Sequence, residues 1–225
     1  MSNIAVFKME KSLKREFDSK AIQKSFSRVY WFYDFWSDRT ESKAAGWLIR
    51  NAGIKNNMNI LDAGTGTGKI LKRIAKLNPD GFNAGIDLSP DMLKIARKNL
   101  QKTGADFELS EASIYELPFP DRKFDLIFTN YVLDLLPEED FEKILNEFKR
   151  VLKTQGTLFL STMTFGRNHI TRFWDMMARK FPSLLTGCRP VSLGNYLKKS
   201  GFEITRKEYI VQNTFPTEVI KAKKA

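Results

Sequence analysis

The sequence predicts an α/β fold in which helices cover both faces of a seven-stranded, mostly parallel sheet. Short apolar runs alternate with amphipathic helical patterns between residues 58 and 162, and a glycine-rich turn follows the first run. Strands that alternate with helices are joined by right-handed crossovers and therefore run parallel. Two late apolar runs have only a short link between them. We expect this last pair to close as a hairpin and add an antiparallel edge to the sheet.

The first half of the chain holds three of the expected strands and the helices between them. The strands are expected at residues 58–63, 82–87 and near 106–110, and the helices at 69–77 and from 90 to about 100. Apolar residues share one side of the first helix at helical spacing, namely Ile70, Leu71, Ile74 and Leu77. Ser89 suits the N-cap of the second helix and Pro90 its first turn.

The second half contains the remaining four strands. They are expected at residues 124–130, 157–162, 202–211 and 218–222, with a helix from 137 to about 153. The acids that follow Pro137 suit the positive end of that helix. Residues 167–185 are expected to form an inserted helix on the side where ligands bind, and Pro216 is placed in the link between the last two strands.

Two parts of the chain differ in composition. Residues 1–50 are expected to form an N-terminal helical arm and an aromatic cap, with the aromatic residues concentrated between Phe26 and Trp36. Residues 51–225 are expected to form the main ligand-binding domain, with a helical insert at about 165–190. A helix that is apolar on nearly all sides is normally buried. The aromatic segment is therefore interpreted either as a lid packed on the sheet edge or as one wall of an apolar pocket.

Composition excludes several classes of protein. Cys188 is the single cysteine, so no intramolecular disulfide framework and no thiolate zinc cluster can form. No metal site is expected. No apolar stretch is long enough to span a bilayer, and the N-terminus lacks a secretory apolar core. These features favour a cytoplasmic protein.

The formal net charge of +11 favours anionic partners. The basic residues are spread from Lys8 to Lys224 rather than clustered, which is typical of solvated helix surfaces. The sequence has no zinc-finger or RNP signature, so a nucleic-acid partner is not expected. Basic residues beside the aromatic segment would suit peripheral contact with an anionic membrane. The oligomeric state is left open.

The segment from Asp62 to Gly68 has the pattern Asp-x-Gly-x-Gly-x-Gly, and Asp87 closes the next strand. A Walker A loop would need a Ser or Thr after Lys69, where Ile70 stands. A dinucleotide fingerprint would need its third glycine at position 69. A structural turn without a ligand is the remaining alternative. Glycines let backbone approach a ligand closely, and an acid after the second strand can bind ribose hydroxyls. The pattern therefore favours a nucleoside-containing cofactor.

Four segments, in order, resemble the class I S-adenosylmethionine (SAM) dependent methyltransferases. They are residues 62–68, 85–93, 116–121 and 124–127, and the unit at 148–156 agrees. The chain is most similar to the quinone-biosynthesis group of small-molecule methyltransferases, over roughly residues 30–222. The resemblance implies a Rossmann-like fold, SAM as cofactor and methyl transfer as the activity.

The resemblance assigns the glycine loop and the two acids to the cofactor. Gly64, Gly66 and Gly68 would line its amino-acid portion with bare backbone. Asp62 would hold the methionyl ammonium group, directly or through water. Asp87 would accept hydrogen bonds from the ribose hydroxyls.

Residues after the second and third strands are assigned by the resemblance to the adenine. Leu88 or Met92 would pack on the ring. Glu111, where the family often has Asp, would accept from the adenine amino group. Ala112 and Ser113 would meet the ring edge.

The remaining expectations concern the methyl group and its acceptor. By resemblance, Asn130 would border the methionyl portion, and Tyr33 belongs to a Tyr-Asp pair in a segment that folds over the cofactor. Three residues could act as a base if the acceptor must lose a proton: Asp134 first, then His169 and Tyr33. Apolar residues of the insert could form a second wall of the acceptor pocket: Ile170, Phe173, Trp174, Met176, Met177 and Phe181.

The sequence thus leads to a SAM-dependent methyltransferase for a small, largely apolar acceptor, such as a quinone precursor or a lipid. N-methylation of a phospholipid amine is the alternative within that class. Methylation of RNA or protein and a non-catalytic SAM-binding module are the remaining alternatives.

Overall fold

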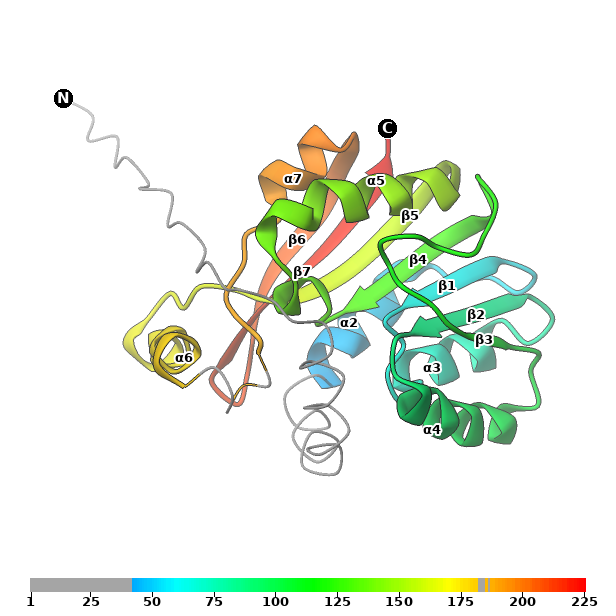
Figure 1. Ribbon diagram of the computed structural model, residues 1–225, viewed down its shortest axis with the longest axis horizontal. Helices are drawn as coiled ribbons and strands as arrows, with labels where there is room; N and C mark the ends of the chain where they lie inside the picture. The colour runs from blue at the N-terminus through cyan, green and yellow to red at the C-terminus, as the bar shows by residue number, and fades with distance from the viewer. Residues whose placement is uncertain (1–41, 182–184, 186) are drawn as a thin grey trace.

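The computed structural model describes residues 42–181, 185 and 187–225. The predicted arm and aromatic segment, and with them Tyr33, lie outside these residues. Seven strands form one sheet in the order β3-β2-β1-β4-β5-β7-β6, flanked by helices on both faces (Figure 1). The predicted α/β fold is confirmed.

β1 to β5 run parallel to one another, and β7 runs antiparallel to both of its neighbours, β5 and β6. The strands are β1 Asn59–Ala63, β2 Phe82–Asp87, β3 Glu108–Glu111, β4 Phe124–Asn130, β5 Leu152–Met163, β6 Phe202–Gln212 and β7 Phe215–Lys224. β1 lies between β2 and β4, although β4 follows three strands later in the chain. The strand order reverses between β1 and β4, and ligands bind at such a switch point in open α/β sheets.

Six α-helices accompany the described strands. They are α2 Ser42–Ala52, α3 Lys69–Leu77, α4 Pro90–Leu100, α5 Phe141–Val151, α6 His169–Lys180 and α7 Gly194–Lys199. Short 3-10 turns η1 Gln101–Thr103, η2 Leu133–Leu135 and η3 Glu138–Asp140 lie between them. Ser89 caps α4 as predicted, with its hydroxyl accepting from the backbone N–H of Met92. No described helix has the length and apolarity required to cross a bilayer.

Several element boundaries differ from the sequence prediction. β5 begins at Leu152 rather than at residue 157, because α5 ends at Val151 and the chain passes directly into the strand. β7 includes Pro216, which was predicted to lie in a link. Proline is tolerated there because the β5–β7 register ends at Thr217, and beyond it Pro216 supplies only its backbone oxygen, which accepts from the N–H of Thr164 at 3.1 Å. α7 was not predicted at all.

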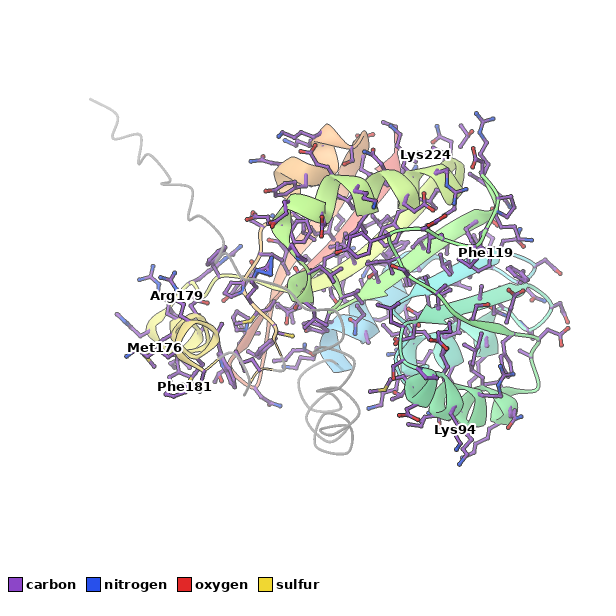
Figure 2. The ribbon with its side chains drawn as sticks, in the orientation of Figure 1. Lys94, Phe119, Met176, Arg179, Phe181 and Lys224 are labelled. Carbon is purple, nitrogen blue, oxygen red and sulfur yellow. The ribbon has the colours of Figure 1, made fainter. Side chains whose placement is uncertain are left out.

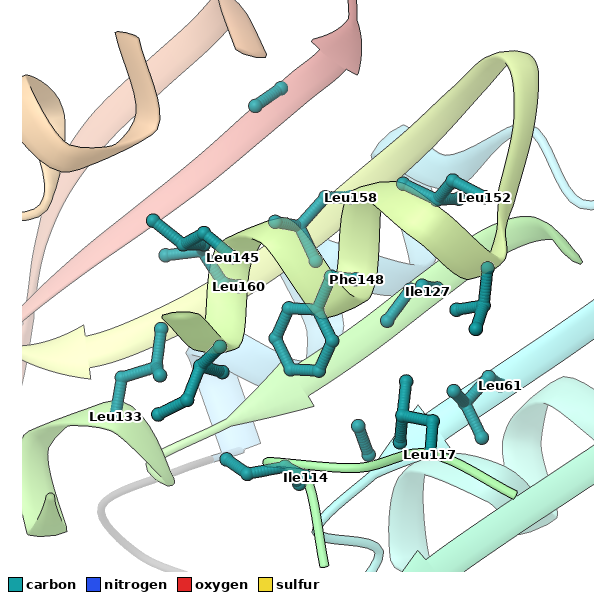
Figure 3. Packing of buried hydrophobic residues seen from close by; sticks show 14 of the residues in the cluster. Leu61, Ile114, Leu117, Ile127, Leu133, Leu145, Phe148, Leu152, Leu158 and Leu160 are labelled. Atoms are coloured by element: carbon teal, nitrogen blue, oxygen red, sulfur yellow. The ribbon is translucent and has the colours of Figure 1, made fainter. Parts of the chain in front are cut away.

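Apolar side chains form a core on each face of the sheet. One cluster joins α5 and α7 to the sheet, and Figure 3 shows Phe148 of α5 above Ile127 and near Leu160. The other cluster joins α2, α3 and α4 to the opposite face. Full burial of each such side chain contributes about 1.5–3 kcal/mol. The two cores fix the carboxyl ends of β1 and β2, where the predicted site residues lie.

Candidate cofactor site

The glycine loop after β1 turns with three left-handed residues. Gly64, Gly66 and Gly68 have φ angles of +77°, +52° and +76°. A Cβ at Gly64 would lie 2.4 Å from a methyl carbon of Val132, so that glycine is needed for packing. A Cβ at Gly66 would meet nothing within 4 Å. The backbone at Gly66 therefore borders open space, as a loop that receives a ligand requires.

Asp62 is the second-last residue of β1, two positions before the first glycine of this loop. Its side chain is 2% exposed, and its Oδ2 accepts a hydrogen bond of 2.7 Å from the hydroxyl of Thr65. The pKa of Asp62 is raised to about 7. Burial is the main cause and the nearby charge of Asp87 adds to it, while the hydrogen bond from Thr65 partly offsets the rise. A cation beside this carboxyl group would stabilise its ionised form.

Asp87 closes β2 and bonds to two backbone groups. Its Oδ2 accepts from the N–H of Gly66 at 2.8 Å, and its Oδ1 accepts from the N–H of Ser89 at 2.9 Å. Burial raises the pKa of Asp87, while these N–H groups partly offset the shift. Each carboxylate oxygen retains a further acceptor lone pair. The two predicted acids thus lie on either side of the same turn.

The residues assigned to the adenine surround the end of β2. Glu111 of β3 pairs in register with Asp87, and it is exposed. The N–H of Ala112 donates to the backbone oxygen of Asp87 at 3.2 Å, and Ser113 follows, half-buried. Leu88 is exposed and Met92 is buried. The structure brings these residues together, and their contacts with adenine stay a prediction.

The residues assigned to the methyl acceptor are spread over a wider area. Asn130 ends β4 and accepts a hydrogen bond from the hydroxyl of Ser161. Asp134 of η2 is completely buried, and its carboxylate accepts from the backbone N–H of Met163 at 2.9 Å. His169 is exposed at the first position of α6. The predicted roles of Asp134 and His169 as a base are not decided by these positions.

Two contributions to the site were not predicted from the sequence. The hydroxyl of Thr65 orients Asp62, and the backbone N–H of Ser89 holds Asp87. A hydroxyl residue three positions after an acid in a tight turn was the available signal for Thr65. Ser89 was recognised only as a helix cap.

The chemistry of this donor set fits SAM. Two carboxyl groups suit its ammonium group and its ribose hydroxyls, and the open backbone at Gly66 lets the ligand approach. In the part of the chain that the structure describes, no cluster of three or more His, Cys, Asp or Glu side chains could hold a metal ion.

Comparison with known proteins agrees with this chemistry. A family model described as a methyltransferase domain matches residues 54–189, which is more than half of the 225-residue chain. A malonyl-[acyl-carrier protein] O-methyltransferase of Acetivibrio thermocellus is 30% identical over 159 residues, which cover 68% of this chain and 54% of that protein. A demethylmenaquinone methyltransferase of Thermus thermophilus is 36% identical over 104 residues, 44% of each chain. The chain thus spans about half the length of these curated relatives.

Solved structures share the fold at low identity. The 1,6-didemethyltoxoflavin-N1-methyltransferase of Burkholderia thailandensis, crystallised with its substrate and S-adenosylhomocysteine, aligns with a TM-score of 0.72 and 16% identity, covering 95% of this chain and 94% of that one. A SAM-dependent methyltransferase from Aquifex aeolicus aligns with a TM-score of 0.64 and 22% identity, covering 93% and 100%. Because its family model spans more than half of the sequence, this chain belongs to the class I SAM-dependent methyltransferases.

Proposed function

We propose that this chain transfers the methyl group of SAM to a small, largely apolar acceptor, with quinone precursors and lipids as the leading class. One observation carries the proposal. Asp62 and Asp87 lie on either side of a glycine turn whose central residue, Gly66, borders open space. This arrangement offers one carboxylate to an ammonium group and another to a ribose, with bare backbone between them.

When bound, SAM supplies an electrophilic methyl group on a sulfonium. The chain's own contribution is to fix the cofactor and to hold the acceptor in line with the methyl group, an effect worth several kcal/mol. Asp62 would hold the ammonium group and Asp87 the ribose. Leu88 and Met92 would contact the adenine, with Glu111 at its amino group.

The named relatives support an acceptor that is either a small molecule or a small acyl group attached to a carrier protein. One is a demethylmenaquinone methyltransferase, and another acts on malonyl-acyl carrier protein. The aromatic segment predicted at residues 26–36 supports an apolar acceptor over a polar one. A quinone precursor or a lipid is both small and largely apolar. A phospholipid whose amine is N-methylated belongs to the same class of acceptor.

Asp134 is the proposed base for an acceptor that must lose a proton. It follows the end of β4, beside the site, and it is the buried carboxyl group of η2. Its hydrogen bond from Met163 fixes the side chain in one orientation. Replacement by Asn keeps that acceptor oxygen and removes the ionisable group, so the variant separates a catalytic role from a structural one.

The acceptor class is tested by incubating the protein with methyl-labelled SAM and a membrane lipid extract. We expect label in the organic phase, and far less of it with the Asp87→Ala variant at limiting SAM, because that variant lacks the proposed ribose contact. Label found only in polar metabolites, or only on added malonyl-acyl carrier protein, would overturn the lipid-like acceptor. SAM binding without any label transfer would favour a non-catalytic binding module.

A further inference from the structure

Helix α6 packs on the protein through Thr171, Ala178 and the half-buried Trp174 and Met177, and it leaves three other large apolar residues outward. Thr171 and Ala178, which lie two turns apart, are 1% and 5% exposed. Ile170 and Phe173 on the other side are 64% and 48% exposed, and Met176 is 41% exposed. An ordinary surface helix directs its large apolar side chains to the core, whereas α6 carries a second apolar face that is exposed.

Specific contacts hold α6 in this orientation. Asn168 and Thr171 form a reciprocal capping box at its first turn. Trp174 anchors the helix to the β6–β7 hairpin: its indole N–H donates to the hydroxyl of Thr214 at 3.0 Å, and its ring packs edge-on against Phe215 with centroids 5.4 Å apart. The outward apolar face is therefore built into the fold, at the side of the sheet where Figure 2 labels Met176 and Phe181.

Positive charge lies along one edge of the apolar face. Arg172 and Arg179 are seven residues apart, so they lie on the same side of the helix, and both are exposed. Lys180 adds a third exposed cation at the last turn. The only acid of the helix, Asp175, is turned away from this face and accepts from the backbone N–H of Gly166 at 3.1 Å. The exposed face thus combines large apolar groups with cations and carries no negative charge.

We propose that α6 is a membrane-docking helix that lies in the headgroup region of an anionic bilayer. Helices of this kind bury an apolar face at the boundary with the acyl chains and place cations against the headgroups. Phe173, Ile170 and Met176 would insert, with Phe181 beside them, and the arginines would contact lipid phosphates. This role is an alternative to the predicted contribution of these apolar residues to an acceptor pocket. The inference does not depend on the methyl acceptor, since a docked enzyme can act on either a lipid or a soluble substrate.

Co-sedimentation with vesicles tests the proposal. The full chain should bind vesicles of phosphatidylcholine with phosphatidylglycerol more tightly than vesicles of phosphatidylcholine alone, and added salt should weaken this binding. Phe173→Glu should weaken it on the order of tenfold or more, because a buried aromatic ring is replaced by a charge. Leu77→Glu, at a leucine that is 50% exposed on α3, is the matched apolar control and should bind as the unaltered chain does.

Two double variants, each reversing two exposed positive charges, test whether the cations of α6 contribute to vesicle binding. Arg172→Glu with Arg179→Glu should reduce binding to the anionic vesicles more than Lys94→Glu with Lys98→Glu, which reverses two exposed charges on α4. Thermal unfolding of every variant shows that the fold is kept. The absence of vesicle binding by the unaltered chain, or equal binding by Phe173→Glu and Leu77→Glu, would overturn the proposal. A concentration-dependent dimer that Phe173→Glu abolishes, without vesicle binding, would assign the face to a second copy instead.

Discussion

The backbone N–H of Gly66 donates a hydrogen bond of 2.8 Å to the carboxylate of Asp87. This bond ties the tip of the turn after β1 to the end of β2, so neither can shift without the other. The side chain that would bind the ribose also sets the shape of the loop that would receive the rest of the cofactor.

Replacing Asp87 by Ala should weaken SAM binding by about 2 kcal/mol, because two charge-assisted hydrogen bonds to the ribose would be lost. Isothermal titration calorimetry measures the change. Asp91→Ala, at an exposed acid in the first turn of α4, is the control and should leave the affinity unchanged. Equal affinity of Asp87→Ala and the unaltered chain would remove Asp87 from the site.

SAM binding should release protons in a way that depends on pH. The pKa of Asp62 is raised to about 7 in the free protein, and an ammonium ligand would lower it. Close to one proton should therefore be released at about pH 6 and few at about pH 8, and affinity should rise between them. Calorimetry in buffers of different ionisation enthalpy counts these protons. Asp62→Asn should abolish most of the release; an unchanged count would assign the proton to another group.

The same raised pKa affects stability. Between the ordinary aspartate pKa of 3.8 and about 7, the folded state binds more protons than the unfolded state does at Asp62. The free energy of unfolding should therefore fall as pH rises through this range. Urea unfolding of the unaltered chain and of Asp62→Asn should show a smaller decline in the variant.

Alanine variants of two glycines distinguish the effect of backbone strain on stability from the effect of a new side chain on SAM binding. Gly66 and Gly104 both have positive φ, and a Cβ at either would meet nothing within 4 Å. Alanine at either position should cost about 1–2 kcal/mol of folding free energy, because the left-handed conformation is strained. Only Gly66→Ala should also weaken SAM binding, because only its Cβ would enter the proposed site. Equal SAM affinity of the two variants would show that the loop does not approach the ligand.

A buried polar network joins β4 to the last hairpin and to α2. The hydroxyl of Tyr131 lies 2.6 Å from that of Thr217 and accepts from the amide of Gln212 at 3.1 Å. Tyr131→Phe should cost about 1–3 kcal/mol, because its buried partners would lose a hydrogen bond. Tyr209→Phe is the control: its buried hydroxyl has no hydrogen-bond partner in the part of the chain described, so its loss should stay within about 0.5 kcal/mol. Chemical denaturation compares the two.

Asp134→Asn should lower kcat by about a hundredfold with little change in the KM for SAM, if a proton must leave the acceptor. Its stability should change little, because the amide oxygen can still accept from Met163. The pH profile of kcat should lose its acidic limb. Unchanged turnover would transfer the role to His169 or Tyr33, or show that the acceptor needs no base.

The sequence predicted the parts of the fold that local chemistry determines. Helix α3 and strands β2 and β4 occur at their predicted bounds, because each combines an unambiguous period with clear end signals. Helix α7 was missed because six residues opening at Gly194 are too few to show helical periodicity. The site acids were identified because they end strands. Asp134 was predicted as the first candidate base, but its complete burial was not predicted, because it depends on how η2 folds against β5.

The orientation of α6 shows the limit of periodicity. The pattern correctly indicates an amphipathic helix, but it does not state which side meets the protein. The pattern predicted neither the exposure of Ile170 and Phe173 nor the burial of Thr171 and Ala178. The deciding contacts are those of Trp174 with Thr214 and Phe215, about 40 residues away in sequence. Contacts between residues so far apart in sequence cannot be inferred from the local pattern of apolar residues.

β7 is made after every other strand of the sheet, yet it lies between β5 and β6. During synthesis, β6 is made before the strand with which it pairs. The edge of β5 stays unpaired until β7 has been synthesised. β7 is therefore the strand that completes the sheet, because both the β5 edge and β6 pair with it. Nascent chains halted before β7 would present an open β5 edge, which makes this interval the one in which chaperones would be needed most.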